Sequence, residues 1–228
     1  MAWRILSALL LLAVLFAPRG AMAAESRGVP LSVEEPTLTA EQIDAILDDR
    51  GSPSAGLGWV FVEASDEFDI NTAVVVAMCI KESNCGGTGA SKRTNNVGNL
   101  IWTRGNDSPY WDGRRSGRWR AYDNRELGIR DMIRLLRVKY VDHGLVTVRK
   151  MAYKYALPFE NDTEGYINTI TALVNQWTAG NIPAVSTSEI RVQTTASTEQ
   201  WCRVYGWHKD YSDSPWEEGW YYSRTRCD

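Results

Sequence analysis

Apolar residues recur with helical spacing in two parts of the chain, residues 39–83 and 123–178, and lose that spacing between them. The pattern predicts a helix that opens at Thr39 and is broken by Gly51–Gly56, followed by helices over about Leu57–Glu67, Thr72–Ser83, Asp123–Tyr140, Thr147–Tyr155 and Asp162–Trp177. Residues 86–121 are instead dense in Gly, Asn, Arg and Trp. Two short strands are expected there, at Asn99–Trp102 and Arg118–Tyr122. The pattern therefore predicts a mainly α protein with a short β segment in its middle.

Residues at the predicted helix starts support this assignment. Thr39 followed by Gln42 is typical of a capping box, and the same spacing recurs for Asp123 and Glu126. Asn71 precedes the third helix and is a favourable N-cap residue.

The N-terminal residues have the composition of an export signal. Arg4 precedes an uncharged stretch, Ile5–Ala17, and Ala21-Met22-Ala23 supplies small residues that suit a signal peptidase. We expect cleavage after Ala23, and hence a secreted or extracytoplasmic protein in the cell wall or periplasm. An uncleaved membrane anchor is the alternative, although the stretch is short for a span.

Three further segments lack helical spacing. Residues 24–38 contain prolines, a glycine and scattered charge, and are expected to form a disordered lead-in. Residues 179–200 are rich in Thr and Ser, and are expected to form a linker. Residues 201–228 hold four Trp and four Tyr but are too few for a core of their own, so a disulfide-tied hairpin is expected. A sugar-binding aromatic patch is the alternative role for this C-terminal segment.

All four cysteines lie in the part predicted to be exported. An even count outside the cytosol indicates two disulfides, and the pairs Cys79–Cys85 and Cys202–Cys227 are favoured because each lies within one segment. The other connectivities stay open. A zinc site is disfavoured because the chain has two His and no CxxC spacing. We expect no metal and no other cofactor.

Charge narrows the class of partner. Removal of residues 1–23, which carry two Arg and no acid, changes the net charge from −3 to −5. An acidic chain is a poor match for nucleic acid, because phosphate binding needs a basic face. No second apolar run is long enough to span a membrane, so stable membrane insertion is not expected. We expect a monomer.

Glu82 is the most unusual candidate for chemistry. The preceding run, Thr72–Ile80, is apolar on all sides and therefore predicts a buried central helix. In the last turn of that helix the dipole disfavours a carboxylate by about 0.3–1 kcal/mol. Burial also raises the pKa of a carboxyl group, so both effects favour the protonated acid that glycoside cleavage requires. The alternative is a structural ion pair, although Lys81 points about 100° away around the helix.

Four motifs in order resemble a known family. They are residues 39–86, which end in Lys81-Glu82-Ser83-Asn84-Cys85-Gly86, then NNVGNL at Asn95–Leu100, WRAYDNRELGIRDMIRLL at Trp119–Leu136, and KYALPFENDTEGYINTI at Lys154–Ile170. This set, within residues 39–178, resembles the lysozyme-like glucosaminidase domain, the mannosyl-glycoprotein endo-β-N-acetylglucosaminidase type of flagellar and autolysin peptidoglycan hydrolases.

The resemblance implies a fold and an activity. The fold would be a lysozyme-like α+β domain, mainly α with a small β-lobe and a groove between lobes. The activity would be hydrolysis of the β-1,4 bond after N-acetylglucosamine in peptidoglycan or a related N-acetylglucosamine-containing glycan. Glu82 would be the general acid, and Tyr155 matches a tyrosine of the family's active site.

A second catalytic carboxylate is not evident in the sequence. Many family members carry one shortly before the segment matched by Trp119–Tyr122, but Ser108-Pro109-Tyr110 stands there. Asp107 and Asp112 flank this position and are candidates for the base, with turn formation as the alternative for each. Without a base, catalysis would depend on Glu82 with help from the N-acetyl group of the substrate.

The middle segment also holds candidates for binding sugar. These are Asn96, Asn99, Trp102, Tyr110, Trp111 and Trp119, each with packing or loop formation as the alternative role. The basic run of Arg114, Arg115, Arg118 and Arg120 is interpreted as a solvated loop face, with carboxylate binding as the alternative.

The sequence therefore predicts a secreted peptidoglycan hydrolase. One alternative is a lytic transglycosylase, which uses a single Glu and leaves an anhydro end. Another is a non-catalytic wall-binding protein. A cysteine peptidase is disfavoured by the even number of cysteines and the scattered histidines.

Overall fold

The computed structural model describes residues 28–104, 108–157 and 162–184, together with the backbone of two strands at residues 201–208 and 219–226. The elements are α2 (Ala40–Asp49), α3 (Gly58–Phe68), α4 (Thr72–Ser83), α5 (Ser91–Thr94), β1 (Arg115–Ser116), β2 (Trp119–Arg120), α6 (Arg125–Lys139), η1 (Val141–His143), α7 (Val148–Tyr155), α8 (Thr163–Thr178), β3 (Trp201–His208) and β4 (Gly219–Arg226). The prediction of a mainly α, lysozyme-like fold with a small β segment is confirmed.

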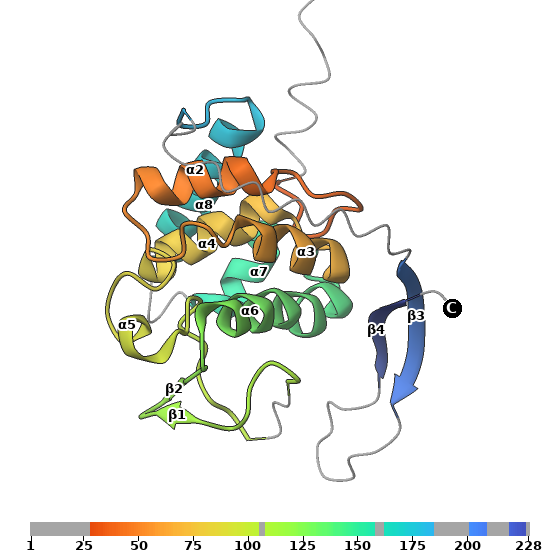
Figure 1. The fold of residues 1–228 in the computed structure, drawn as a ribbon. Helices are drawn as coiled ribbons and strands as arrows, with labels where there is room; N and C mark the ends of the chain where they lie inside the picture. Colours follow the sequence, from red (N-terminus) through yellow and green to blue (C-terminus); the bar gives the residue numbers. More distant parts are fainter. Residues whose placement is uncertain (1–27, 105–107, 158–161, 185–200, 209–218, 227–228) are drawn as a thin grey trace, which may run out of the picture.

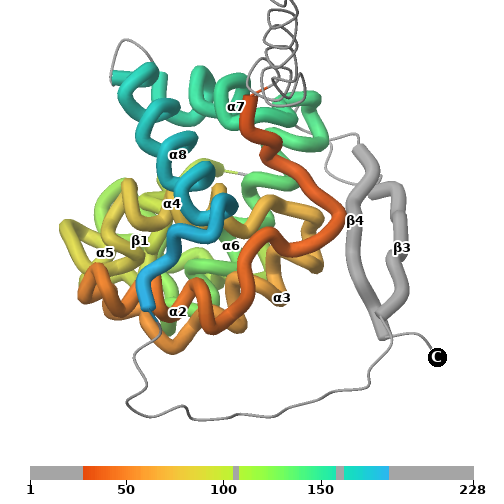
Figure 2. Tube along the Cα trace, turned by 90° about the horizontal axis from the view of Figure 1, so that it is seen from above, coloured from red at the N-terminus to blue at the C-terminus, as the bar shows by residue number. Residues whose placement is uncertain are grey.

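Helix α4 is the centre of the helical part (Figures 1 and 2). Every residue from Thr72 to Cys79 is buried, as the apolar run predicts. The helix packs against α8 and α3, while α6 packs against α3. The side chain of Asn71 caps α4 by accepting a hydrogen bond from the main-chain N–H of Val74. The buried helix thus holds its C-terminal turn, which contains Glu82, in a fixed position.

The small β-lobe lies beyond α5 and α6 (Figure 1). Strands β1 and β2 pair antiparallel, and Ile101 forms an isolated bridge with Trp119. The predicted strand Asn99–Trp102 is therefore shortened to this bridge, and β1 and the single turn of α5 were not predicted. Asn99 has a left-handed backbone with φ 50°, which no strand residue adopts.

A buried ion pair ties the β-lobe to α6. Both Arg120 and Asp131 are 0% exposed, and Arg120 Nη1 lies 2.5 Å from Asp131 Oδ2. The hydroxyl of Tyr122 donates to the same Oδ2 over 2.7 Å. Arg120 therefore lies inside the molecule, which corrects its assignment to a solvated basic run.

Two boundaries differ from prediction. Residues 28–38 are ordered rather than disordered, because Leu31 and Leu38 are buried in the core and the N–H of Leu31 donates to Val146 O over 2.9 Å. Helix α6 is capped by Asn124 rather than by Asp123. The carboxylate of Asp123 is paired with Arg114 instead.

The chain ends are described only in part. Strands β3 and β4 pair antiparallel over their whole length, from Trp201 with Arg226 to His208 with Gly219. The predicted signal peptide, most of the predicted linker and Cys227 lie outside the described residues, so the Cys202–Cys227 disulfide stays a prediction. Across the part of the chain that the structure describes, no helix is both long and apolar enough to cross a membrane.

Candidate active site

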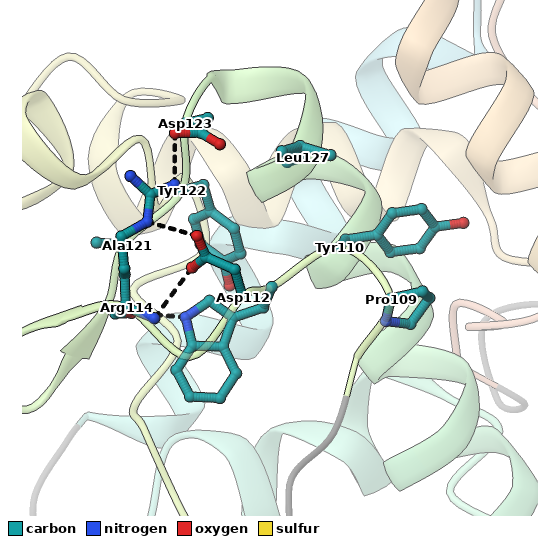
Figure 3. Close-up of a pocket in the computed structure, with 9 residues that line it drawn as sticks. Pro109, Tyr110, Asp112, Arg114, Ala121, Tyr122, Asp123 and Leu127 are labelled. Carbon is teal, nitrogen blue, oxygen red and sulfur yellow. Dashed lines mark hydrogen bonds and ion pairs between the residues drawn. The ribbon is translucent and has the colours of Figure 1, made fainter.

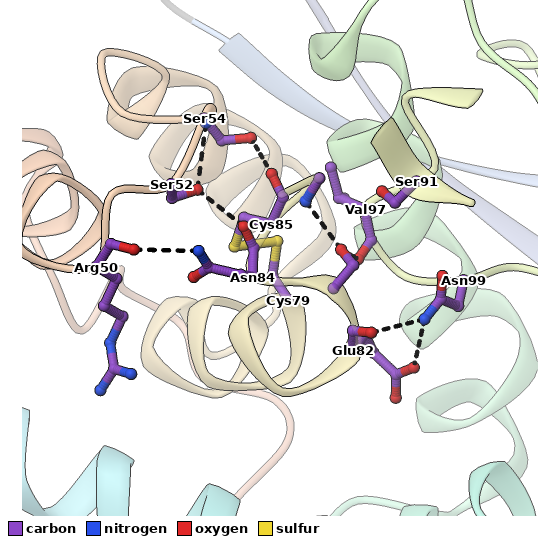
Figure 4. Close-up of a disulfide and its surroundings, with 12 residues drawn as sticks. Arg50, Ser52, Ser54, Cys79, Glu82, Asn84, Cys85, Ser91, Val97 and Asn99 are labelled. Carbon is purple, nitrogen blue, oxygen red and sulfur yellow. Dashed lines mark hydrogen bonds between the residues drawn. A yellow bond between two sulfur atoms is a disulfide. The ribbon is translucent and has the colours of Figure 1, made fainter. Parts of the chain in front are cut away.

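The C-terminal end of α4 is closed by a tight left-handed turn. Asn84 and Cys85 both have positive φ, 49° and 48°. Their main-chain N–H groups donate back to Ile80 O over 2.9 Å and to Cys79 O over 3.0 Å. The predicted disulfide between Cys79 and Cys85 crosses the same turn (Figure 4). The cysteine after Glu82 thus belongs to this turn, and Gly86 continues it with a φ of 96°, a conformation that favours glycine.

Side chains of neighbouring segments tie this turn to the rest of the domain (Figure 4). Ser83 Oγ donates to Val97 O over 2.7 Å and accepts from the N–H of Gly86 over 2.8 Å. From the loop before α3, Ser54 Oγ donates to Cys85 O over 2.6 Å. The residues that follow Glu82 are thus held by buried hydrogen bonds.

Glu82 itself is partly exposed and is held by two neutral donors. Asn99 Nδ2 donates to Glu82 Oε2 over 3.3 Å and to the main-chain oxygen of Glu82 over 2.7 Å. On the other side, the hydroxyl of Tyr166 donates to Oε1 over 3.1 Å. No ion pair of Glu82 is found within the described ranges, and Lys81 is exposed. The alternative of a structural ion pair is therefore not supported.

The environment of Glu82 raises the pKa of its carboxyl group above the usual 4.5. Burial is the largest cause, because it penalises the charged form. The hydrogen bonds from Asn99 and Tyr166 and the positive charge of Lys81 act in the opposite direction and do not cancel it. The direction agrees with the prediction from the sequence.

Three tyrosines gather beside this carboxyl group. The rings of Tyr140 and Tyr155 lie 6.0 Å apart, and those of Tyr155 and Tyr166 lie 6.1 Å apart. Burial, with the nearby Glu82 as a second cause, raises the pKa of Tyr140 to about 12 and moves those of Tyr155 and Tyr166 well above their usual value. All three phenols therefore stay neutral at physiological pH.

Tyr155 is close to this site but is not in contact with the carboxyl group through its hydroxyl. That hydroxyl donates to Gly98 O over 2.7 Å. Tyr166, eleven residues later on α8, makes the contact instead. Tyr166 lies on the buried face of α8 with Ile167 and Ile170, and only its hydroxyl distinguishes it from these apolar residues.

Asp112 was a candidate for the base with turn formation as the alternative, and its contacts in the structure are those of a turn. Its carboxylate accepts a hydrogen bond from the main-chain N–H of Arg114 over 3.0 Å. The same carboxylate forms an ion pair with the Arg114 side chain, whose Nε lies 2.6 Å from Asp112 Oδ2. The pKa of the Asp112 carboxyl group is lowered, and the hydrogen bond from the main-chain N–H of Arg114 is the largest cause. Asp112 is exposed, and its contacts share no residue with those of Glu82. Asp107 lies outside the described residues.

Tyr110 and Trp111 line a pocket in the β-lobe together with Asp112 and the first turn of α6 (Figure 3). Glu82 does not line this pocket. The hydroxyl of Tyr110 donates to Glu67 over 3.1 Å, and the Trp111 ring N–H donates to Arg114 O over 2.6 Å. Both polar groups thus serve the structure of the lobe.

The other predicted sugar-binding residues fall into two groups. Trp102 and Trp119 are partly exposed, and the guanidinium groups of Arg115 and Arg118 lie 4.5 and 4.6 Å above their rings. Sugar binding by Trp102 and Trp119 stays a prediction. Asn96 is only 1% exposed, and its amide bonds the backbone of Leu100 and Arg120. Asn96 is therefore a structural residue of the β-lobe, which corrects its assignment to binding.

A buried central helix that ends in a half-buried carboxyl group, with a small β-lobe beside it, defines a lysozyme-like domain. The chain matches the family model of mannosyl-glycoprotein endo-β-N-acetylglucosaminidase over residues 58–206, which is more than half of its length. It belongs to this Glucosaminidase family and is a glycoside hydrolase of that type. The match begins at the first residue of α3 and extends into β3.

Solved structures of S. aureus autolysin E show a similar fold. A catalytic glutamate-to-alanine mutant in complex with the disaccharide NAG-NAM has a TM-score of 0.50 and 16% identity, and the similarity covers 68% of this chain and 75% of that one. The same protein in complex with the muropeptide NAM-L-Ala-D-iGlu has a TM-score of 0.49 and 15% identity, and the similarity covers 74% of this chain and 82% of that one. No curated protein sequence gives a significant match.

Proposed function

We propose that the chain is a secreted peptidoglycan hydrolase that cleaves the β-1,4 bond after N-acetylglucosamine, with Glu82 as the general acid. The observation that carries the proposal is the partly exposed carboxyl group of Glu82, whose pKa is raised by burial at the end of a rigid helix. A raised pKa lets such a group keep its proton to a higher pH than a free glutamate does, which favours its role as a proton donor to a glycosidic oxygen. The peptidoglycan fragments bound by autolysin E, a protein of similar fold, support this class of substrate.

In this mechanism Glu82 gives its proton to the glycosidic oxygen as the bond to the anomeric carbon breaks. Water then bonds to the anomeric carbon directly, or the N-acetyl oxygen of the substrate bonds to it first and closes a ring that water opens. In the second route the Glu82 carboxylate takes the proton that this water loses. The second possibility needs no further carboxylate. It fits the described part of the chain, where the candidate base Asp112 is engaged with Arg114.

The engagement of Asp112 with Arg114 also favours one alternative, a lytic transglycosylase, which needs no second acid. That reaction uses the same glutamate as acid and then as base, and it closes an anhydro ring in place of adding water. Both reactions require Glu82, and the two products differ in mass by one water.

Secretion is a further part of the proposal. Residues 1–23 have the composition of an export signal, and the Cys79–Cys85 disulfide is typical of an oxidising compartment.

The test is digestion of purified cell wall by the wild type and by Glu82→Gln, with mass analysis of the fragments. We expect new reducing ends at N-acetylglucosamine from the wild type and no turnover from the variant, which keeps the shape of the side chain without its acidity. Anhydro ends would assign the chain to the transglycosylases. Wall binding without any released fragment would make it a binding protein, and residual activity above a few per cent in Glu82→Gln would remove Glu82 as the acid.

A further inference from the structure

The two oxygens of the Glu82 carboxyl group face donors of different chemistry. Oε2 faces Asn99 Nδ2 at 3.3 Å, and Oε1 faces the hydroxyl of Tyr166 at 3.1 Å. An amide nitrogen donates hydrogen bonds but accepts none, whereas a hydroxyl can do both. Oε2 is therefore an acceptor in both protonation states, and a proton placed on it would point at an N–H.

We propose that Asn99 and Tyr166 are positioning residues that place the acid proton of Glu82 on Oε1, with Asn99 keeping Oε2 as the acceptor. The proton then leaves Oε1 for the glycosidic oxygen, and the electron pair of the broken O–H bond stays on Oε1. The Tyr166 hydroxyl donates to that oxygen and stabilises the carboxylate that results. The location of the proton is independent of the reaction, but its catalytic consequence rests on the proposed function.

Asn99 is well placed for this role because one nitrogen binds two parts of the same residue. Nδ2 donates to the main-chain oxygen of Glu82 over 2.7 Å as well as to Oε2. That main-chain oxygen lies in the last turn of α4, where carbonyl groups lack partners within the helix. The amide thus fixes the side chain of Glu82 relative to its own backbone.

Other ionisable groups near Glu82 do not replace these two donors. Lys81 on α4 is exposed and acts only through its charge. Tyr140 follows α6 and Tyr155 ends α7, and both are neutral phenols whose own pKa is raised by the charge of Glu82. Asn99 and Tyr166 therefore make the direct hydrogen bonds to the carboxyl oxygens.

The backbone of Asn99 allows a clean removal of its amide. Its φ of 50° is left-handed, so Asn99→Gly removes the side chain without adding strain. Asn95→Gly is a matched control, because Asn95 has a φ of 54° and its amide donates to Tyr122 O and Asp123 O rather than to Glu82. Tyr166→Phe is matched by Tyr153→Phe, at an exposed position on α7 where the lost hydroxyl served Glu164.

The measurement is the pKa of Glu82, followed by carbon NMR of glutamate-labelled protein and assigned by its loss in Glu82→Gln. Asn99→Gly and Tyr166→Phe each remove a donor to the charged form, so we expect both to raise the pKa of Glu82 while the two controls leave it unchanged. The descending limb of the pH–activity profile should move to higher pH in the same two variants. We also expect Asn99→Gly to lower kcat by about 10- to 100-fold, because the acid is no longer held in place.

Circular dichroism and the melting temperature establish that each variant is folded, and Asn99→Ala, which removes the same amide without adding a charge, replaces Asn99→Gly if the latter unfolds. A shift in only one variant, in neither, or of equal size in the controls overturns the proposal. Its failure is separable from that of the proposed function. If the pKa of Glu82 shifts in Asn99→Gly and Tyr166→Phe but Glu82→Gln is active, only the role of Glu82 as general acid is refuted. If Glu82→Gln is inactive but the pKa of Glu82 does not shift in the other two variants, only the positioning role is refuted.

Discussion

The hydroxyl of Ser83 donates a hydrogen bond to the main-chain oxygen of Val97 over a distance of 2.7 Å, and both residues are buried. Ser83 is the residue after Glu82, whereas Val97 lies two residues before Asn99, which donates to the Glu82 carboxyl group. One buried hydrogen bond therefore fixes the distance between the segment that carries the acid and the segment that orients it.

We predict that Ser83→Ala destabilises the protein by about 1–3 kcal/mol, because it leaves Val97 O and the N–H of Gly86 without their buried partner. Activity at saturating substrate should fall as well, since the acid is no longer held in register with Asn99. Urea unfolding and wall digestion measure the two effects. Ser116→Ala, at an exposed position on β1, is the control and should change the free energy of unfolding by less than about 0.5 kcal/mol.

The dependence of stability on pH provides a prediction with a definite sign. The pKa of Glu82 is raised in the folded protein above the 4.5 expected when unfolded, so the folded state binds more protons between these two values. The contribution of Glu82 to stability is therefore complete below pH 4.5 and is lost as pH rises through the folded pKa. Glu82→Gln has no such loss.

We therefore expect Glu82→Gln to be more stable than the wild type at neutral pH, by an amount that shrinks as the pH falls toward 4.5. Chemical unfolding of both proteins across pH 4–8 measures the difference. A difference that does not vary with pH would contradict a raised pKa. The exposed Glu164, whose pKa is lowered by Arg149 and Tyr153, offers a comparison of opposite sign in Glu164→Gln.

Much of the helical framework could be predicted because its signals are local. The capping box of Thr39 and Gln42 is present as expected, and α4 has the predicted ends, because a cap and an apolar run determine both. The β-lobe was harder to predict, because its strands depend on contacts far apart in sequence. Asn96, for example, uses its amide on the backbone of Leu100 and Arg120, which no local pattern indicates.

The candidate site, like the fold, could be predicted from the sequence only where the signal is local. Glu82 could be found because an acid at the end of an apolar helix is unusual in the sequence itself. Tyr166 could not, since a tyrosine on an apolar helix face is ordinary until the fold brings it 3.1 Å from Oε1 across 84 residues of chain. The turn role of Asp112 was already open from the sequence, because Asp112-Gly113 is a favourable turn pair, and the structure adds its contacts with Arg114.

The disulfide beside Glu82 should contribute to stability and to activity. Cys79 and Cys85 are both 0% exposed and lie six positions apart in the sequence. A disulfide that closes a loop of this size stabilises the folded state by about 2 kcal/mol in the chain-entropy model. We predict that the double variant Cys79→Ala/Cys85→Ala loses stability of that order. Its activity should fall even at temperatures at which the variant is fully folded, since the turn after Glu82 is no longer held by the disulfide.

Chemical unfolding of the double variant, with digestion assays well below its melting temperature, tests this point. Cys202→Ala/Cys227→Ala is the comparison, because these residues lie outside residues 39–178. Unchanged wall digestion in Cys79→Ala/Cys85→Ala would show that the disulfide does not position the acid. Peptide mapping without reduction tests the predicted Cys202–Cys227 bond in the same samples.

The ion pair between Arg120 and Asp131 should matter most when one partner is removed. Both side chains are 0% exposed, so Asp131→Ala leaves a guanidinium charge buried without its carboxylate and also removes the partner of the Tyr122 hydroxyl. We expect a loss of about 3–5 kcal/mol, measured by urea unfolding. The exposed pair of Arg149 and Glu164 is the matched control, and Glu164→Ala should cost less than about 1 kcal/mol. Equal losses in the two variants would mean that burial does not determine the strength of the contact that holds the β-lobe on α6.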